Sequence, residues 1–325
     1  MSKLKTAVVG VGYLGKFHAE KFAQLPSSHL VAVSDVDHQR CYDQAQQHGV
    51  EAVIDYQSLI GMVDAVSIAV PTPLHHEVAL FFLNHGIHVL LEKPIATTLA
   101  EADDLIAAAR KNQVVLQIGH LERFNNTVKS VEPLLSSHLR FIESLRLAPF
   151  KLRGSDVSVV LDLMIHDIDI IQSMVKADIH RISANGASVL SPETDLANAR
   201  LEFTNGCVAN VTASRISLKT ERRLRIFQHD SYIALDLDNK TIAIHRKGTQ
   251  EMFPGIPEIT REILTVNKGD ALKDQINAFL RCIIDNTPPI VSAEEGKRAL
   301  ATALEITRIV QFSNQQYPLT STATR

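Results

Sequence analysis

Three ionisable side chains interrupt an otherwise apolar stretch of the chain. The segment from Val157 to Val175 is long enough for a buried helix, and it contains Asp162, His166 and Asp169. On an α-helix these positions are i, i+4 and i+7, which predicts that they share one face. A histidine suits general-base chemistry near neutral pH, and a neighbouring carboxylate orients and tunes it. Because ionisable groups are costly among apolar neighbours, we expect a catalytic pair; the alternative is a buried structural Asp–His pair.

A lysine follows another apolar run. Residues His88 to Leu91 are typical of a buried strand, and Glu92, Lys93 and Pro94 come directly after it. Ligands of open parallel sheets bind at the carboxyl ends of the strands. We therefore expect Lys93 to face the position of a nicotinamide, where it could donate a hydrogen bond to a reacting oxygen. The alternative is a surface lysine near a loop.

Glycines at the first predicted strand-to-helix turn have the spacing G-x-G-x-x-G. Gly10 permits a tight turn, Gly12 lets the backbone approach a pyrophosphate, and Gly15 permits close packing of the helix on the strand. The positive end of that helix then faces the phosphates. Asp35 follows the second predicted strand, where a carboxylate would bind the adenosine ribose. Strand, turn, helix and carboxylate together predict a dinucleotide site.

The charge around Asp35 favours NAD over NADP. A carboxylate there binds the ribose 2′-hydroxyl of NAD and repels the 2′-phosphate of NADP. Asp37 adds a second negative charge, whereas His38 and Arg40 could hold a phosphate and are the argument for NADP. The sequence therefore predicts NAD as the cofactor, with NADP as the less favoured choice.

The elements around these residues predict two domains. Short apolar strands alternate with helices over residues 1–122, which predicts an α/β Rossmann domain with a doubly wound parallel sheet. Residues 123–325 predict an α+β domain with a mainly antiparallel open sheet, and its final helix could pack back on the first domain. A Gly- and Pro-rich loop is expected near 248–257. The predicted strands of the second domain are Ala199–Phe203, Cys207–Ser214, Leu224–Gln228, Tyr232–Leu237 and Thr241–His245.

Composition excludes several other functions. The 325 residues carry a formal net charge of −3, which offers no basic surface for nucleic acid. No apolar run approaches the ~20 residues of a membrane span. Three distant cysteines, with no CxxC spacing, predict reduced thiols in the cytoplasm, and no cluster has the spacing of a metal site.

Four motifs together resemble the Gfo/Idh/MocA oxidoreductases. They are Gly10–Gly15, Pro71–His75, His88–Pro94 and the pair in Leu161–Asp167. The resemblance implies a dehydrogenase of sugars or cyclitols, and a homodimer or homotetramer formed through the second domain's sheet. It implies that Lys93, Asp162 and His166 are catalytic. The cofactor-binding residues that it implies are Gly10, Gly12, Tyr13, Leu14, Gly15, Asp35, Pro71, Thr72, His75, Glu92 and Lys93.

Within that family, three further segments are similar to enzymes that oxidise the 3-hydroxyl of UDP-N-acetylglucosamine. These are Gly119–Asn125, Ala148–Phe150 and Asp156–Asp169. The similarity implies a cytoplasmic enzyme whose ketone product passes to an aminotransferase in amino-sugar synthesis for lipid A.

The nucleotide-sugar substrate would be held through its diphosphate. Arginine forks match phosphate oxygens, and the substrate-binding candidates are Arg123, Asn125, Lys151 and Arg153, together with Asp162 and His166. A solvated basic loop is the alternative for Lys151 and Arg153. Two other functions stay open: a dehydrogenase of another sugar or a cyclitol, and a ligand-sensing regulator that binds a dinucleotide without catalysis.

Overall fold

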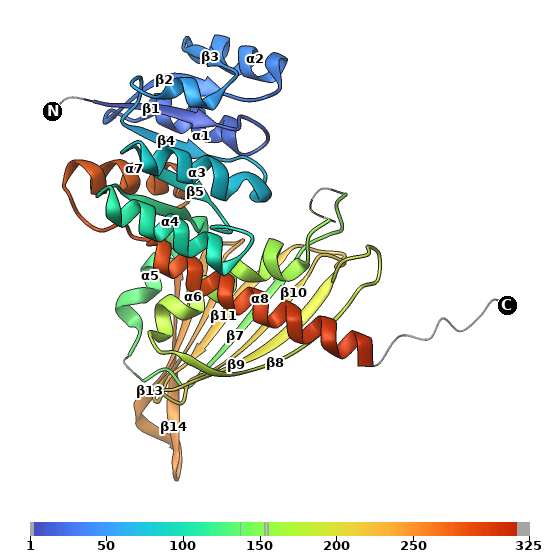
Figure 1. Cartoon of the computed structure of the whole chain (residues 1–325). Helices are drawn as coiled ribbons and strands as arrows, with labels where there is room; N and C mark the ends of the chain where they lie inside the picture. The colour runs from blue at the N-terminus through green and yellow to red at the C-terminus, as the bar shows by residue number, and fades with distance from the viewer. Residues whose placement is uncertain (1–2, 137, 153, 155, 317–325) are drawn as a thin grey trace. The chain divides into compact units, whose positions relative to one another are not determined.

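Two units make up the computed structural model, which describes residues 3–136, 138–152, 154 and 156–316 (Figure 1). Unit 1 consists of residues 1–124 and 270–300, and unit 2 consists of residues 125–269 and 301–325. Unit 1 therefore takes in residues 270–300, which the sequence analysis assigned to the second domain. Each unit carries part of the candidate chemistry and is described by itself.

A six-stranded parallel sheet forms the centre of unit 1, in the order β3-β2-β1-β4-β5-β6. The strands are β1 (Leu4–Val9), β2 (Ser28–Ser34), β3 (Glu51–Val53), β4 (Ala65–Ile68), β5 (His88–Glu92) and β6 (Leu116–Gly119). Val8, Val66 and Leu90 on the central strands have no exposed surface, as expected for a parallel sheet covered on both faces. This strand order is that of doubly wound dinucleotide-binding folds, so the predicted Rossmann sheet is confirmed.

Local signals in the sequence set the ends of the helices of unit 1. The Asp37 side chain caps α2 by accepting from the Arg40 backbone N–H, and Gly49 ends this helix in the left-handed conformation that glycine adopts readily. The helices are α1 (Gly15–Gln24), α2 (His38–His48), α3 (His75–Asn84), α4 (Leu99–Lys111), α7 (Ala271–Ile284) and the first part of α8 (Ala293–Gln316). Three short 3-10 helices are η1 (Tyr56–Leu59), η2 (Thr72–Leu74) and η3 (Leu121–Phe124).

Helix α7 belongs to unit 1 because its apolar face is buried there. Ile276, Phe279 and Leu280 are fully buried in one hydrophobic cluster with Phe22 of α1 and Val8 of β1. Burying three large apolar side chains stabilises this contact by several kcal/mol, at about 1.5–3 kcal/mol each. Sequence periodicity shows that α7 has an apolar face but not which sheet covers it.

An eight-stranded sheet dominates unit 2, in the order β14-β13-β12-β11-β7-β10-β9-β8. Neighbouring strands are antiparallel except for the pair β7–β10, so the predicted mainly antiparallel sheet is confirmed. The strands are β7 (Phe141–Leu147), β8 (Ile179–Ala187), β9 (Leu196–Phe203), β10 (Val208–Ser214), β11 (Glu221–Phe227), β12 (Ser231–Asp236), β13 (Thr241–Phe253) and β14 (Ile256–Thr265).

The loop expected near 248–257 is mostly β-structure. Strand β13 continues to Phe253 and β14 begins at Ile256, so only Pro254 and Gly255 form the turn. Gly255 has a φ of +77°, which glycine adopts at no steric cost. The loop prediction was wrong because the glycines and prolines were interpreted as one irregular segment, whereas they mark one tight turn and a change of register within the hairpin.

Helices cover one face of the sheet of unit 2. Helix α6 packs against β7 and β10. The helical elements are α5 (Asn126–Val131), the 3-10 helix η4 (Glu132–Leu134), the π-helix η5 (Val160–Met164), α6 (Ile165–Val175) and the second part of α8. Among the described residues, no helix combines the length and the apolar character needed to cross a bilayer.

Candidate active site

The glycine turn after β1 has the close contacts that the motif predicts. Gly10 has a φ of +84°, and a Cβ there would lie 2.8 Å from the backbone nitrogen of Val70. A Cβ on Gly15 would lie only 1.8 Å from the carbonyl oxygen of Gly10. By contrast, a Cβ on Gly12 would meet no atom within 4 Å. The turn is thus packed tightly against the protein on one side, and at Gly12 it leaves the open space that an approaching pyrophosphate requires.

Helix α1 begins at this turn, and its N-terminal residues carry no negative charge. Its N-cap residue Leu14 makes no side-chain capping hydrogen bond, and its first turn contains no acidic residue. Lys16 adds a positive charge and lies 5.7 Å from the ring centroid of Tyr13, which is 62% exposed. A helix N-terminus of this kind attracts anions. The predicted contacts of Tyr13 and Leu14 with a cofactor are compatible with their exposed positions beside the turn.

Asp35 braces the glycine turn. Its carboxylate is 7% exposed and accepts from the backbone N–H groups of Val11 and Asp37, both at 2.9 Å. Arg40 Nη1 lies 3.3 Å from each oxygen of Asp35, while Nη2 lies 2.9 Å from Asp37. The one guanidinium is therefore shared by two carboxylates. An ionised carboxylate has about four acceptor positions, and these four contacts fill them, so a ribose hydroxyl would bind Asp35 in place of the longer contacts from Arg40.

The ends of β4 and β5 are joined by a buried histidine. His75 is 1% exposed, and its Nδ1 and Nε2 lie 2.8 Å from the Pro94 carbonyl oxygen and 3.0 Å from that of Val70. Burial lowers the pKa of His75, so the ring is neutral and donates to one carbonyl at a time. We therefore expect His75 to hold the loops after β4 and β5 in place by hydrogen bonds, and we expect Pro71 and Thr72 to lie closer to the cofactor.

Lys93 comes directly after β5 and is half-buried. The residue before it, Glu92, ends the strand and lies 3.1 Å from Nε2 of His18. The placement of Lys93 at the carboxyl end of a central strand is the one that the sequence predicted.

In unit 2 the helix that carries Asp162 and His166 is not regular. Asp162 lies within the π-helix η5, whereas His166 is the second residue of α6. A π-turn contains more residues than an α-helical turn, so this segment is not the continuous α-helix that the apolar run predicted. The expected α-helix therefore begins only at Ile165, and the shared face of Asp162, His166 and Asp169 stays a prediction. Asp162 and His166 are half-buried, and Asp169 is buried.

Sequence reasoning missed the ion pair beside His166. Arg146 of β7 contacts both oxygens of Asp167, with Nε at 2.7 Å and Nη2 at 3.0 Å. The two side chains are 5% and 4% exposed. This bidentate pair ties α6 to the sheet at the residue next to His166. The available signal was Arg146 itself, a charge at an inward position of an alternating strand.

A second buried arginine organises the segment before η5. Arg215 Nε donates to Asp195 at 2.9 Å, and Nη1 donates to the carbonyl oxygens of Gly154 and Val157. Nη2 donates to Ser191 Oγ and to the carbonyl of Thr194. Burial raises the pKa of Asp195, but hydrogen bonds from Ser191 and backbone N–H groups outweigh it and hold that pKa well below its usual range. This network fixes the backbone at Gly154 and Val157.

The predicted diphosphate residues have different surroundings. Arg123 pairs with Glu295 at 3.2 Å, and the Asn125 side chain caps α5. These contacts give both side chains a structural role within their own units. Lys151 is exposed in the loop after β7, and Arg153 lies outside the described residues. Lys151 is thus the described candidate with the most accessible charge.

Comparison with known proteins agrees with both units. Residues 4–120 match the family model described as oxidoreductase family, NAD-binding Rossmann fold, and residues 148–233 match the GFO/IDH/MocA C-terminal domain. A UDP-N-acetylglucosamine 3-dehydrogenase of Acidithiobacillus ferrooxidans is 37% identical over 306 residues, which are 94% of this chain and 97% of that protein. A myo-inositol 2-dehydrogenase of Thermotoga maritima is 26% identical over 91% of this chain and 93% of its own length.

Solved structures extend the similarity. A structure of the A. ferrooxidans enzyme superposes with a TM-score of 0.91 at 37% identity, covering 96% of this chain and 99% of that one. The resemblance found in the sequence motifs, the predicted NAD-binding Rossmann domain and the dehydrogenase class are therefore confirmed. The chain belongs to the Gfo/Idh/MocA oxidoreductase family.

Proposed function

We propose that this protein oxidises the 3-hydroxyl of UDP-N-acetylglucosamine to a ketone with NAD. The observation that carries the proposal is the 37% identity, over nearly the full length of both chains, to the A. ferrooxidans enzyme of that name. The glycine turn and Asp35 fit a dinucleotide, and the two carboxylates around Arg40 favour NAD over NADP. The polar residues proposed to react are present in both units.

The chain's own residues would divide the reaction as follows. His166 accepts the proton of the hydroxyl, and Asp162 orients and tunes the imidazole. Lys93 donates a hydrogen bond to the same oxygen and stabilises the charge that develops on it. NAD, when bound, supplies the acceptor for the hydride that leaves the sugar carbon.

Recognition of the nucleotide part would come from the loop after β7. Lys151 offers an exposed ammonium for the diphosphate, and Arg215 donates hydrogen bonds to the carbonyl oxygens of Gly154 and Val157, which follow Lys151 in the sequence. The alternative substrate class is a cyclitol or free sugar, which the 26% identity to a myo-inositol dehydrogenase keeps in view. A nucleotide sugar carries a diphosphate, whereas a cyclitol or a free sugar does not.

The test is NADH formation, followed by absorbance, with purified protein, NAD and UDP-N-acetylglucosamine. NADP, free N-acetylglucosamine and myo-inositol serve as comparisons. Turnover only with NAD and the nucleotide sugar supports the proposal. Turnover of myo-inositol alone would reassign the substrate. Absence of turnover with UDP-N-acetylglucosamine, free N-acetylglucosamine and myo-inositol, while NAD still binds, would favour a regulator that senses a ligand.

The product has a place in a reaction sequence. Oxidation creates a ketone, which is the group that an aminotransferase converts to an amine. We propose that such an enzyme consumes the product in amino-sugar synthesis. We place the reaction in the cytoplasm, where the free, buried thiols of Cys41, Cys207 and Cys282 stay reduced.

We also propose that a second copy of the chain covers the open face of the sheet in unit 2. A row of rings crosses four neighbouring strands there: Phe141, Phe227, Tyr232 and His245. Consecutive ring centroids are 5.8, 4.8 and 5.3 Å apart. Aromatic side chains gathered on one sheet face are typical of an interface core.

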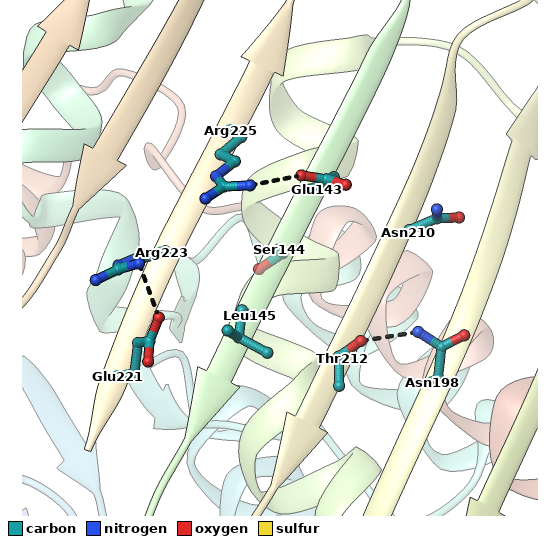
Figure 2. Close-up of a pocket in the computed structure, with 9 residues that line it drawn as sticks. All are labelled: Glu143, Ser144, Leu145, Asn198, Asn210, Thr212, Glu221, Arg223 and Arg225. Atoms are coloured by element: carbon teal, nitrogen blue, oxygen red, sulfur yellow. Dashed lines mark hydrogen bonds and ion pairs between the residues drawn. The ribbon is translucent and has the colours of Figure 1, made fainter. Parts of the chain in front are cut away.

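Figure 2 shows polar residues of the same face. Arg225 pairs with Glu143 across neighbouring strands at 3.3 Å, and Arg223 pairs with Glu221 at 3.1 Å. Polar groups of both signs on a self-complementary surface suit a two-fold interface. Light scattering after gel filtration should give the mass of a dimer or tetramer. Tyr232→Glu should lower that mass, Tyr42→Glu on α2 of unit 1 should not, and a monomeric wild-type protein would refute this interface.

A further inference from the structure

Three polar side chains form a hydrogen-bonded chain beneath the carboxyl end of β5. His18 of α1 is 1% exposed, and its Nδ1 lies 2.7 Å from Oγ of Ser67, a fully buried residue of β4. Its Nε2 lies 3.1 Å from Oε1 of Glu92, whose side chain is 13% exposed. These hydrogen bonds thus connect the middle of the Rossmann core to Glu92, the residue that precedes Lys93.

The proton positions in the hydrogen bonds of Ser67, His18 and Glu92 follow from the chemistry of these side chains. An ionised carboxylate only accepts, so Nε2 of His18 carries a hydrogen and donates it to Glu92. In a neutral ring Nδ1 then accepts, and the Ser67 hydroxyl has the hydrogen to donate. A single neutral tautomer satisfies both contacts, which makes the chain well suited to hold Glu92 in one position.

Glu92 is also confined by the neighbouring strand β6. A Cβ on Gly119 of β6 would lie 2.9 Å from Oε1 of Glu92, so the carboxyl group passes directly over that glycine. Burial raises the pKa of Glu92, but the hydrogen bond from His18 and the positive charge of Lys93 outweigh it and hold the pKa below its usual value. Glu92 is therefore an anion at neutral pH.

We propose that His18, supported by Ser67, is a positioning residue for Lys93: it holds the Glu92 carboxylate as a fixed anion beside Lys93, and that anion keeps the lysine a charged hydrogen-bond donor. The inference deepens the proposed function, because it rests on Lys93 as the donor to the reacting oxygen. The Glu92 side chain points into the core, whereas Lys93 lies at the end of the strand. The buried contact between His18 and Glu92 therefore controls the charge of a lysine at the edge of the sheet.

The first test needs neither NAD nor sugar. The pH dependence of Lys93 labelling by an amine reagent, read by mass spectrometry of its peptide, gives the midpoint at which the amine loses its proton. In His18→Leu this midpoint should fall by about one pH unit, because the Glu92 carboxylate loses the bond that holds it in place beside the lysine. In His18→Gln, whose side-chain amide can still donate to Glu92, the midpoint should fall less.

Controls separate this effect from general damage. His88 is a partly buried histidine at the other end of β5, where its Nδ1 accepts from the Val115 N–H. His88→Gln should leave the midpoint of Lys93 unchanged. If His18→Leu does not fold, Gly119→Ala tests the same carboxylate from β6, because the new Cβ must displace it. An unchanged Lys93 midpoint in a folded His18→Leu or Gly119→Ala protein would overturn the inference.

Kinetics give the second test. His18→Leu should lower kcat at least about tenfold, leave the Kd of NAD and the KM of the sugar within about twofold, and move the acid limb of the kcat profile to higher pH. The double variant His18→Leu/Glu92→Gln should be no slower than Glu92→Gln alone, since both act through one carboxylate. A wild-type protein without turnover would sink the proposed function, yet the labelling experiment would still decide the role of His18.

Discussion

Replacing Arg146 with methionine would leave the Asp167 carboxylate buried without its guanidinium. The pair is bidentate, at 2.7 and 3.0 Å, and both side chains are at most 5% exposed. Breaking such a pair by removing one partner costs about 3–5 kcal/mol, because the remaining charge stays desolvated. Arg146→Met should therefore lower the opening free energy of unit 2 by that amount. The double variant Arg146→Met/Asp167→Leu should recover most of the loss, since it leaves no buried charge.

The assay for stability is hydrogen exchange of the β7 and α6 amides, which reports on unit 2 separately from the Rossmann unit. Catalysis should not recover with stability. Because Asp167 is adjacent to His166, the double variant loses the bond that fixes the start of α6, and its kcat should fall at least about tenfold. NAD affinity should stay unchanged in both variants. A loss below about 1 kcal/mol in Arg146→Met, or full kcat in a stable double variant, would refute this reasoning.

Three further predictions concern other parts of the chain. Gly12→Ala should fold normally, because its Cβ meets no atom within 4 Å, yet it should raise the Kd of NAD about tenfold or more by titration; Gly15→Ala should not fold stably, because its Cβ would lie 1.8 Å from a carbonyl oxygen of the turn. Arg215→Lys keeps the charge but loses the fork that holds Gly154, so the KM for the nucleotide sugar should rise about tenfold in initial-rate assays with the NAD Kd unchanged. Burial lowers the pKa of His88 below its unfolded value. As pH falls through and below about 6.5, the unfolded chain therefore binds a proton at His88 before the folded chain does, and the free energy of unfolding decreases. Urea unfolding at several pH values should show a smaller decrease in His88→Gln than in the wild type.

Local patterns carried the prediction of the Rossmann unit. The glycine spacing, the strand that precedes it and Asp35 all concern residues that act within one βαβ segment. Helix ends were equally local, as with Gly49 at the end of α2. Such features depend on backbone conformation at a few neighbouring residues, which the residue types specify directly.

Tertiary packing decided what could not be predicted. Apart from Asp162, the residues of η5 are apolar, so periodicity could not show that Val160–Met164 forms a π-turn instead of an α-helical one. The partners Arg146 and Asp167 are 21 residues apart, and pairing at that distance depends on how α6 packs on β7. Helix α7 had a clear apolar face, but its place in unit 1 depends on a cluster that residues from both ends of the chain form.

The two candidate reactive residues share one mode of support. Lys93 follows Glu92, which His18 of another element holds; His166 precedes Asp167, which Arg146 of another element holds. Neighbouring residues in a strand or helix point in different directions, so a buried, hydrogen-bonded neighbour fixes the backbone while the reactive side chain stays accessible. The sequence reveals the reactive residue because a polar group stands in an apolar run. The sequence does not reveal the contact that holds the neighbouring acid, because the partner residue comes from a distant segment. Positioning residues of this family are therefore best sought beside the reactive ones, as buried acids paired with a base from a different element.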